Sequence, residues 1–252
     1  MARLTPLLAL LLALCLCRAA SATEPTAPAA APATDADARA LTLPAPLKLR
    51  YTIYGKVGFL PYRAGGFLSW THDGARYDAR MEVEVFLLGS RVQTSQGRIS
   101  AAGLQPLRFV DRVNADRTVE FDYPRQRILF SEGTPPEPLS AGAQDQLSVF
   151  IQLGALIGAA PQRYPAGSVI TLAAMGIYGP ETWRFNVVGE ESLHLPGGEV
   201  RTLRLSRPPA RGDDPSADIW LAPSLGWLPA RIRLSQPNGD YIDQRWRGSE
   251  TP

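Results

Sequence analysis

Apolar and polar residues alternate along most of this chain from residue 47 onward. In the first alternating stretch, residues 47–54, Leu49 and Ile53 fall on one face and Arg50 and Thr52 on the other. Strict alternation of this kind is typical of a β-strand with one buried face. The pattern therefore predicts a strand here, and residues 77–85 repeat it more clearly, because apolar and charged residues alternate without interruption.

Turn residues separate the alternating stretches. Asp73-Gly74 and Asn238-Gly239 lie between pairs of them and predict two hairpins. Further strands are predicted at 91–96, 98–101, 107–113, 118–123, 127–131, 169–174, 183–188, 193–195, 200–206, 217–222, 230–234 and 241–246. About a dozen short strands joined by turns indicate an antiparallel all-β sheet, and a sheet of that size has to curl or close.

One segment departs from this rhythm. Leu147 and Phe150 recur at helical spacing, Ser140 can cap the start of a helix, and Pro161 can end it. The pattern predicts a helix over 140–160 that covers the concave face of the sheet. The predicted fold class is thus all-β dominated: an antiparallel curled sheet, an open or half β-barrel, with one central α-helix as a lid.

The first 22 residues differ from the rest. Arg3 is followed by an apolar run over 4–17 and by Ala20-Ser21-Ala22, a small-residue cleavage site. This pattern predicts a secretory signal peptide that is cleaved after Ala22, and hence a periplasmic protein. Residues 23–46, rich in Ala and Pro, are predicted to form a disordered linker, and residues 47–249 a single β-rich domain.

A lipid anchor is the alternative to soluble export. A bacterial lipoprotein is cleaved just before a cysteine, after a small residue. Here Leu14 precedes Cys15 and Leu16 precedes Cys17, which departs from that pattern. We therefore favour soluble export and expect no transmembrane segment in the mature chain.

Cleavage changes the charge and the cysteine content. The chain has 26 Lys and Arg against 24 Asp and Glu, and the predicted signal peptide holds Arg3, Arg18 and both cysteines but no acid. The mature chain would therefore be neutral and free of thiols. Neutrality argues against nucleic acid as a partner, which a basic face would bind. Without thiols there can be no disulfide, no Cys-ligated metal and no Cys nucleophile.

Several short motifs resemble those of a known family. They are Gly97-x-Ile99, Gly103-Leu104-x-Pro106-x-Arg108-Phe109, Phe121-Asp122, Gln144-Asp145-x-Leu147-Ser148, Trp220-Leu221-Ala222-Pro223 and Leu228-Pro229-x-Arg231-Ile232-Arg233. In this order they resemble the bacterial domain-of-unknown-function family 3108, over nearly the whole mature chain. The resemblance implies an exported proteobacterial protein and a curled sheet similar to the open barrels of the periplasmic lipoprotein carriers. It implies no reaction.

Catalytic and metal-binding motifs are absent from the sequence. There is no G-x-S-x-G, no S-x-x-K and no Walker loop. His72 and His194, the two histidines, are expected on the surface, and nothing marks a Ser-His-Asp triad. Asp213, Asp214 and Asp218 could ligate Ca²⁺, but their spacing matches no calcium loop, so we expect solvated side chains. No enzyme activity, no metal and no cofactor are predicted.

We assign a structural role, rather than a ligand-binding one, to two pairs of polar residues. Gln144 and Asp145 lie near the start of the predicted helix, where capping and a hydrogen bond to the sheet are favoured over ligand contact. Arg231 and Arg233 alternate with apolar residues and are expected on the solvent side of a strand.

The aromatic residues give the one positive indication of a function. By strand parity most of them share the apolar face, which would be either a packed core or the wall of an apolar cavity under the helix. The candidate ligand-binding residues are Trp70, Tyr77, Met81, Phe109, Phe121, Leu147, Phe150, Ile151 and Trp183.

The leading hypothesis is a periplasmic, non-enzymatic half-barrel that binds an acyl chain or a similar apolar molecule of the cell envelope. The first alternative is a periplasmic scaffold or interaction module with a filled core, which would bind an envelope protein through its convex face or the 207–215 loop. A hydrolase with an unrecognised site is the weaker alternative.

Overall fold

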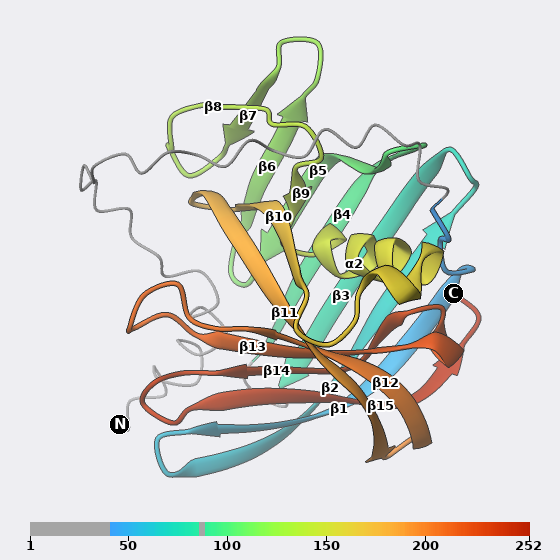
Figure 1. The fold of residues 1–252 in the computed structure, drawn as a ribbon. Coiled ribbons are helices and arrows are strands. Elements are labelled where there is room, and N and C mark those ends of the chain that lie inside the picture. The colour runs from blue at the N-terminus through green and yellow to red at the C-terminus, as the bar shows by residue number, and fades with distance from the viewer. Residues whose placement is uncertain (1–40, 86–88) are drawn as a thin grey trace, which may run out of the picture.

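The computed structural model of this protein describes residues 41–85 and 89–252 (Figure 1). The predicted signal peptide and most of the predicted linker lie outside these residues. The strands form one 15-stranded sheet in the order β8-β7-β6-β5-β4-β3-β2-β1-β15-β14-β13-β12-β11-β10-β9. Neighbouring strands are antiparallel except β9 and β10, which are parallel. β8 and β9 are its two edges, so the sheet is curled but open.

The bounds of the elements are as follows. The first seven strands are β1 (Leu47–Val57), β2 (Leu60–His72), β3 (Arg76–Val85), β4 (Gly89–Ser100), β5 (Gly103–Arg112), β6 (Asp116–Asp122) and β7 (Arg127–Phe130). Then come β8 (Glu137–Pro138), β9 (Gln144–Asp145), helix α2 (Ser148–Ala159) and the short 3₁₀ helix η2 (Pro161–Arg163). The remainder are β10 (Val169–Gly176), β11 (Gly179–Leu195), β12 (Gly198–Arg207), β13 (Ser216–Ala222), the 3₁₀ helix η3 (Pro223–Leu225), β14 (Leu228–Ser235) and β15 (Tyr241–Glu250).

The curl of the sheet encloses the helix. In Figure 1 the blue-to-green strands rise steeply, the orange and red strands β12–β15 run across below them, and α2 lies in the angle between the two sets. The helix contacts β5, β9 and β14. The predicted half-barrel with one central α-helix is therefore confirmed for the described residues.

Alternation in β1 produces the expected burial. Leu49, Tyr51 and Ile53 are completely buried, as their shared face predicts. Both predicted hairpins also form: His72 pairs with Tyr77, and Ser235 with Tyr241. The Asp-Gly and Asn-Gly signals succeed because each turn needs a glycine with positive φ, which a residue without a Cβ adopts at low cost.

Two pairs of predicted strands are in fact single strands. Residues 91–96 and 98–100 belong to the continuous β4, whose register shifts between Gln96 and Gly97; residue 101 lies in the turn that follows. Residues 183–188 and 193–195 belong to β11, which shifts between Val187 and Gly189. A β-bulge lets a strand change register without ending. In the sequence, the bulge interrupts the alternation of apolar and polar residues and therefore resembles the end of a strand.

The helix is shorter than predicted. It spans Ser148–Ala159, and Ser140 does not cap it. Residues 144–145 instead form β9, and the Asp145 Oδ1 accepts hydrogen bonds from the backbone N–H groups of Leu147 (2.9 Å) and Ser148 (2.8 Å). Asp145 thus takes the role assigned to Ser140, because the chain returns to the sheet in β9 after residue 140 and the helix starts only beyond it.

Burial extends around most of α2. Val149, Leu153 and Ile157 lie on one side of the helix and Ile151 on the opposite side, and all four are completely buried. Phe150, by contrast, is only partly buried. The helix therefore packs into the concave side of the sheet, and one of its sides is left facing open space.

Candidate ligand cavity

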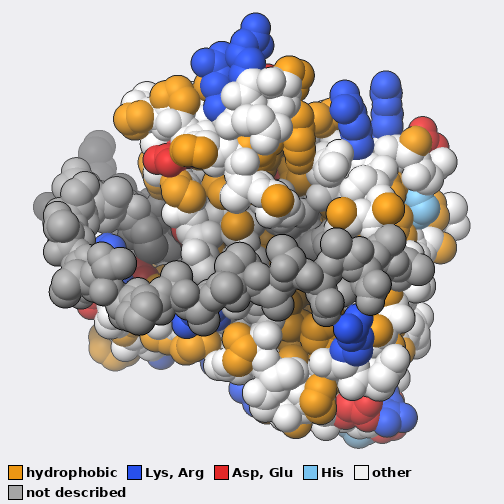
Figure 2. Space-filling view, turned by 45° about the horizontal axis from the view of Figure 1, so that its top comes forward, with side chains coloured by type: hydrophobic (Ala, Val, Ile, Leu, Met, Phe, Trp, Pro, Cys, Tyr) orange, Lys and Arg blue, Asp and Glu red, His pale blue; other side chains and the backbone are white. Residues whose placement is uncertain are grey.

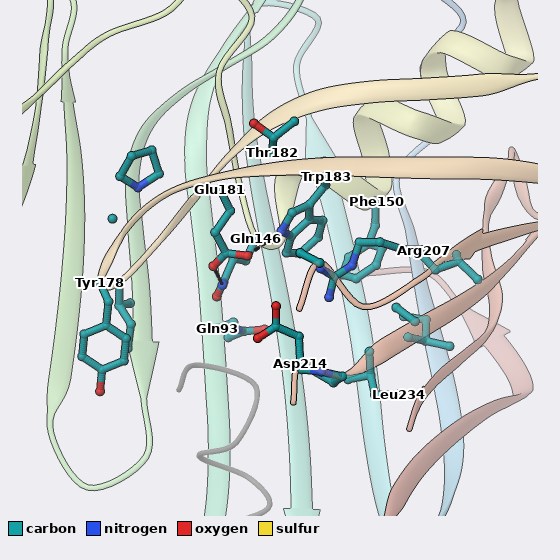
Figure 3. A pocket seen from close by; sticks show the side chains of 18 of the residues that line it. Gln93, Gln146, Phe150, Tyr178, Glu181, Thr182, Trp183, Arg207, Asp214 and Leu234 are labelled. Carbon is teal, nitrogen blue, oxygen red and sulfur yellow. Dashed lines mark hydrogen bonds between the residues drawn. The ribbon is translucent and has the colours of Figure 1, made fainter. Parts of the chain in front are cut away.

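A cavity of about 650 Å³ lies on the concave side of the sheet (Figure 3). Its walls come from β3, β4, the β7–β8 segment, α2, β11 and the turn before it, the end of β12 with the loop that follows, and strands β13–β15. These elements are far apart in sequence and are brought together by the curl of the sheet.

One wall of the cavity is apolar. Strand pairing places Ile219, Ile232 and Gln244 in one row across β13–β15, and Leu234 and Ile242 in the next. Apolar side chains from other elements complete it: Met81 and Val83 of β3, Phe150 of α2, and Trp183 and Phe185 of β11. These residues face inward because every second side chain of a strand lies on the same side of the sheet.

The other side carries polar groups. The Glu181 carboxylate accepts hydrogen bonds from Gln146 Nε2 (3.3 Å) and from Trp183 Nε1 (2.7 Å). The Arg207 guanidinium stacks over Trp183, with its Cζ 4.7 Å from the ring centre. Figure 3 shows Gln93 and Asp214 near the same polar groups. The cavity therefore presents an apolar surface next to a hydrogen-bonding one.

Positive and negative charges balance in the cavity lining. Three arginines, Arg91, Arg207 and Arg211, face three acids, Glu137, Glu181 and Asp214. Arg91 makes a bidentate pair with Asp111, at 2.8 Å and 2.5 Å, and both side chains are buried. The lining thus favours neither a cation nor an anion through net charge.

A second set of polar side chains lies outside the cavity, where the interior beneath α2 is packed. Ser95 Oγ donates to Asp145 Oδ2 at 2.5 Å and lies 3.0 Å from the Tyr77 hydroxyl. Burial raises the pKa of Asp145 to about 6, although the hydrogen bonds from Ser95 and Ser148 oppose the shift. This cluster ties the start of α2 to β3 and β4.

Two glutamines fix the helix to β5. Gln144 Nε2 donates to the Leu104 carbonyl, and the Leu104 N–H donates to Gln152 Oε1, both at 2.9 Å. Gln144 and Asp145 therefore act as expected from the sequence, in capping and in hydrogen bonds that reach the sheet.

The comparisons with known proteins decide the family. Residues 50–244 match the family described as "Protein of unknown function (DUF3108)". The chain belongs to this family. The resemblance drawn from the short motifs is therefore confirmed, and no curated protein matches the chain.

One solved structure supports the fold of this DUF3108 member. A beta-barrel-like protein of the domain of unknown function DUF1849 from Brucella abortus superposes with a TM-score of 0.57 at 10% identity, covering 84% of this chain and all of that one. A putative outer membrane lipoprotein-sorting protein domain from Vibrio parahaemolyticus gives a TM-score of 0.29 at 9% identity, covering 82% of this chain and 85% of that one. The first likeness shows a shared barrel-like fold; the second is too low to support an argument.

Three of the nine candidate ligand-binding residues line the cavity. They are Met81, Phe150 and Trp183. The other six are buried in the core without lining it: Trp70, Tyr77, Phe109, Phe121, Leu147 and Ile151. Strand parity identified the inner face correctly, but parity does not show which part of that face α2 covers.

Apart from Asp214, the polar residues of the cavity were not singled out from the sequence. Arg207 continues the alternation of Leu203 and Leu205, and Gln244 continues that of Ile242, so both had to face inward. A polar residue in an apolar alternating series was the available signal.

The histidines lie outside the cavity. His194 is exposed, as expected, with its Nε2 3.8 Å from Glu199. His72 is not a surface residue: it is half-buried against Trp70, and its Nε2 lies 3.0 Å from the Pro44 carbonyl oxygen. Within residues 41–85 and 89–252, no three His, Cys, Asp or Glu side chains converge in a way that could hold a metal ion.

The acidic loop does not form a cluster. Asp214 lines the cavity, whereas Asp218 pairs with Arg204 at 3.1 Å on the outer face. Asp213 is exposed.

The expectation for Arg231 and Arg233 needs correction. Both lie on the outer face, but Arg231 is largely buried, because it binds the completely buried Asp243 carboxylate at 2.7 and 2.6 Å. Arg233 and Arg245 approach the same carboxylate. The outer face of β14 and β15 is thus a paired charge cluster.

The surface charges are dispersed. Figure 2 shows Lys and Arg side chains in separate groups on the visible face of the described residues. In the part of the chain that the structure describes, no helix is both long enough and apolar enough to cross a membrane.

Proposed function

We propose that this protein binds an acyl chain, or a similar apolar molecule of the cell envelope, in the cavity between α2 and the sheet, and that it does so without catalysis. The cavity carries the proposal: its volume of about 650 Å³ lies within the range of small-molecule sites, and most of one wall is apolar. Each buried CH₂ group would contribute about 0.8 kcal/mol, so a short acyl segment suffices for useful affinity.

The state of the ionisable groups supports binding rather than reaction. Glu181 is held by Trp183 and Gln146, and Arg91 by Asp111. Neither histidine lines the cavity. The barrel-like fold shared with the Brucella protein is consistent with an enclosed ligand but does not identify one.

We place this function in the periplasm on the strength of the predicted signal peptide. Mass spectrometry of the protein isolated from the periplasm tests both parts of the proposal. The intact mass should correspond to a chain that begins at Thr23, and an organic extract should contain an apolar envelope molecule. An acylated cysteine at the N-terminus would contradict soluble export.

Titration with a fluorescent fatty-acid probe tests binding directly. Wild-type protein should bind the probe, and Phe150→Ala should change the affinity while the fold survives, because Phe150 lines the cavity and is only partly buried. Phe59→Ala is the matched control: Phe59 is fully exposed at the β1–β2 turn and should leave binding unchanged.

Failure of the wild type to bind would favour the interaction module. The observation behind that second candidate is the pair of exposed apolar residues Phe59 and Leu60 at the β1–β2 turn. Phe59→Ala would then reduce binding to an envelope protein, and Phe150→Ala would only lower stability.

A further inference from the structure

Gln244 of β15 is a polar residue in the apolar wall of the cavity. Its side chain is 4% exposed, and its cross-strand neighbours on either side are Ile53 and Ile232. It lines the cavity together with Ile219, Leu234 and Ile242. An amide at this position is surrounded by hydrocarbon on the sheet side.

The Gln244 amide oxygen is unpaired. Oε1 is buried and has no hydrogen-bond partner among the described residues. Gln152 Oε1 accepts from the Leu104 N–H, and Gln146 donates to Glu181. Gln144 Oε1 is also unpaired among these residues, but Gln144 does not line the cavity, so Gln244 is the glutamine whose unpaired oxygen lies in the cavity wall. A buried acceptor without a donor lowers stability, so native proteins leave few of them.

A ligand can supply the missing donor. A purely apolar chain would cover the amide and leave Oε1 unpaired, which weakens binding. A charged group at this depth would lose its hydration, and the lining offers no net charge to compensate for the loss. A neutral hydroxyl or amide N–H satisfies the acceptor without either penalty.

We propose that the cavity selects an amphipathic ligand whose apolar chain carries one neutral hydrogen-bond donor, a hydroxyl or an amide N–H, which donates to Gln244 Oε1. The proposal rests on the proposed function and narrows it. Plain acyl chains bind through burial alone, and chains with a correctly placed donor bind more tightly.

Competition against the fluorescent fatty-acid probe tests this selectivity. The competitors are tetradecanoic acid, a series of tetradecanoic acids that each carry one hydroxyl at a different chain position, and the matched oxo acids. Wild-type protein should prefer the best hydroxy acid over the plain acid by about tenfold, the effect of one hydrogen bond to a buried acceptor. The oxo acids, which lack a donor, should gain nothing.

The variant Gln244→Leu keeps the size of the side chain and removes the acceptor. It should lose the preference for the hydroxy acid and bind the plain acid at least as tightly as wild type. Gln162→Leu is the control, because Gln162 is exposed in η2 and does not line the cavity; it should retain the preference. If Gln244→Leu does not fold, as thermal melts would show, Gln244→Met provides the same test.

The outcomes separate this inference from the proposed function. Absence of probe binding by the wild type overturns both. Equal affinity for plain and hydroxylated acids overturns only the inference. If the oxo acids bind as tightly as the hydroxy acids, the Gln244 amide presents its N–H to the ligand and the inference is wrong. The inference is also wrong if Gln244→Leu still prefers the hydroxy acid.

Discussion

The concave face of β3 passes from a packed part of the interior to a hollow part. Tyr77 and Ala79 lie in the core beneath α2, whereas Met81 and Val83, farther along the same strand, line the cavity. The strand alternates regularly throughout, so its own sequence does not create the difference. The position of α2 does, because the helix fills the curl over one part of the strand and leaves the next part open.

The polar side chains of the packed and hollow parts also differ, in whether they find hydrogen-bond partners within the protein. In the packed part Tyr77, Ser95 and Asp145 form hydrogen bonds with one another. In the hollow part the Gln244 oxygen has no partner among the described residues. The Tyr77, Ser95 and Asp145 side chains thus satisfy one another, whereas on the proposed function the Gln244 oxygen is satisfied by the ligand.

The largest expected effect comes from Phe109 in the packed part. Phe109 is completely buried, so Phe109→Ala should lower the free energy of unfolding by about 3–5 kcal/mol through lost burial and a new cavity. Met81→Ala in the hollow part should cost less, about 1–2 kcal/mol, because it enlarges an existing space rather than opening a new one.

Denaturant unfolding of the two variants measures this contrast. The dependence of the unfolding free energy on denaturant concentration should stay the same in both, so that the midpoints report stability. Equal losses for Phe109→Ala and Met81→Ala would mean that Met81 is packed in solution and that the interior has no hollow part.

The next effect is a pH dependence set by Asp145. Burial raises its folded-state pKa to about 6, above the unfolded value of 3.8. The folded state therefore holds this proton more tightly, so the contribution to stability is present below pH 4 and is lost as the pH rises through 6. The loss should amount to roughly 2–3 kcal/mol. Asp145→Asn should abolish it, since the amide can accept from the backbone and pair with Ser95.

The pKa of Asp243 is shifted in the opposite direction, so its contribution to stability has the opposite pH dependence. Burial disfavours its charged form, but hydrogen bonds from Arg231 and Arg245 outweigh burial and hold its pKa below the usual range. Its contribution is present above the unfolded pKa and is lost as the pH falls through the lower folded pKa. Unfolding measured from pH 3 to pH 8 in wild type, Asp145→Asn and Asp243→Asn should separate the two. If Asp145→Asn leaves the dependence of the unfolding free energy on pH unchanged, Asp145 is not the group that causes the loss of stability near pH 6.

Local patterns in the sequence were sufficient for the strands and for the fold class. The alternation of Leu49, Tyr51 and Ile53 and the Asp73-Gly74 turn depend on neighbouring residues only, and both were predicted correctly. The bulge at Gly97 was not, because it depends on a close approach to β5: a Cβ there would lie 2.2 Å from the Gln105 carbonyl oxygen.

The cavity could be predicted only in part, for a related reason. Met81, Phe150 and Trp183 were identified from their inward-facing positions. Whether an inward residue meets the helix or open space depends on where α2 rests in the curl. That position is set by contacts between residues distant in sequence, such as Gln152 with Leu104, which no local pattern contains.

The last effect tests what places α2 against Trp227, which lies between η3 and β14. A Cβ on Gly154 would lie 2.5 Å from the Trp227 carbonyl oxygen, and Trp227 already has a φ of +66° that limits its freedom to move. In a free helix Gly→Ala stabilises by about 1 kcal/mol. Here Gly154→Ala should instead destabilise the protein by about 1–3 kcal/mol, because backbone has to shift.

Gly158→Ala and Gly212→Ala sharpen this last test. At Gly158 the nearest obstacle is the Trp227 side chain, Cδ1 at 2.7 Å, which can move more easily than backbone, so the loss should be smaller than for Gly154→Ala. Gly212 has open space and should be nearly neutral. Thermal melts rank the three variants, and probe titration shows whether displacement of α2 reaches Phe150 one turn earlier. If Gly154→Ala raises the melting temperature, the helix does not rest on Trp227, and the boundary between the packed and hollow parts is set elsewhere.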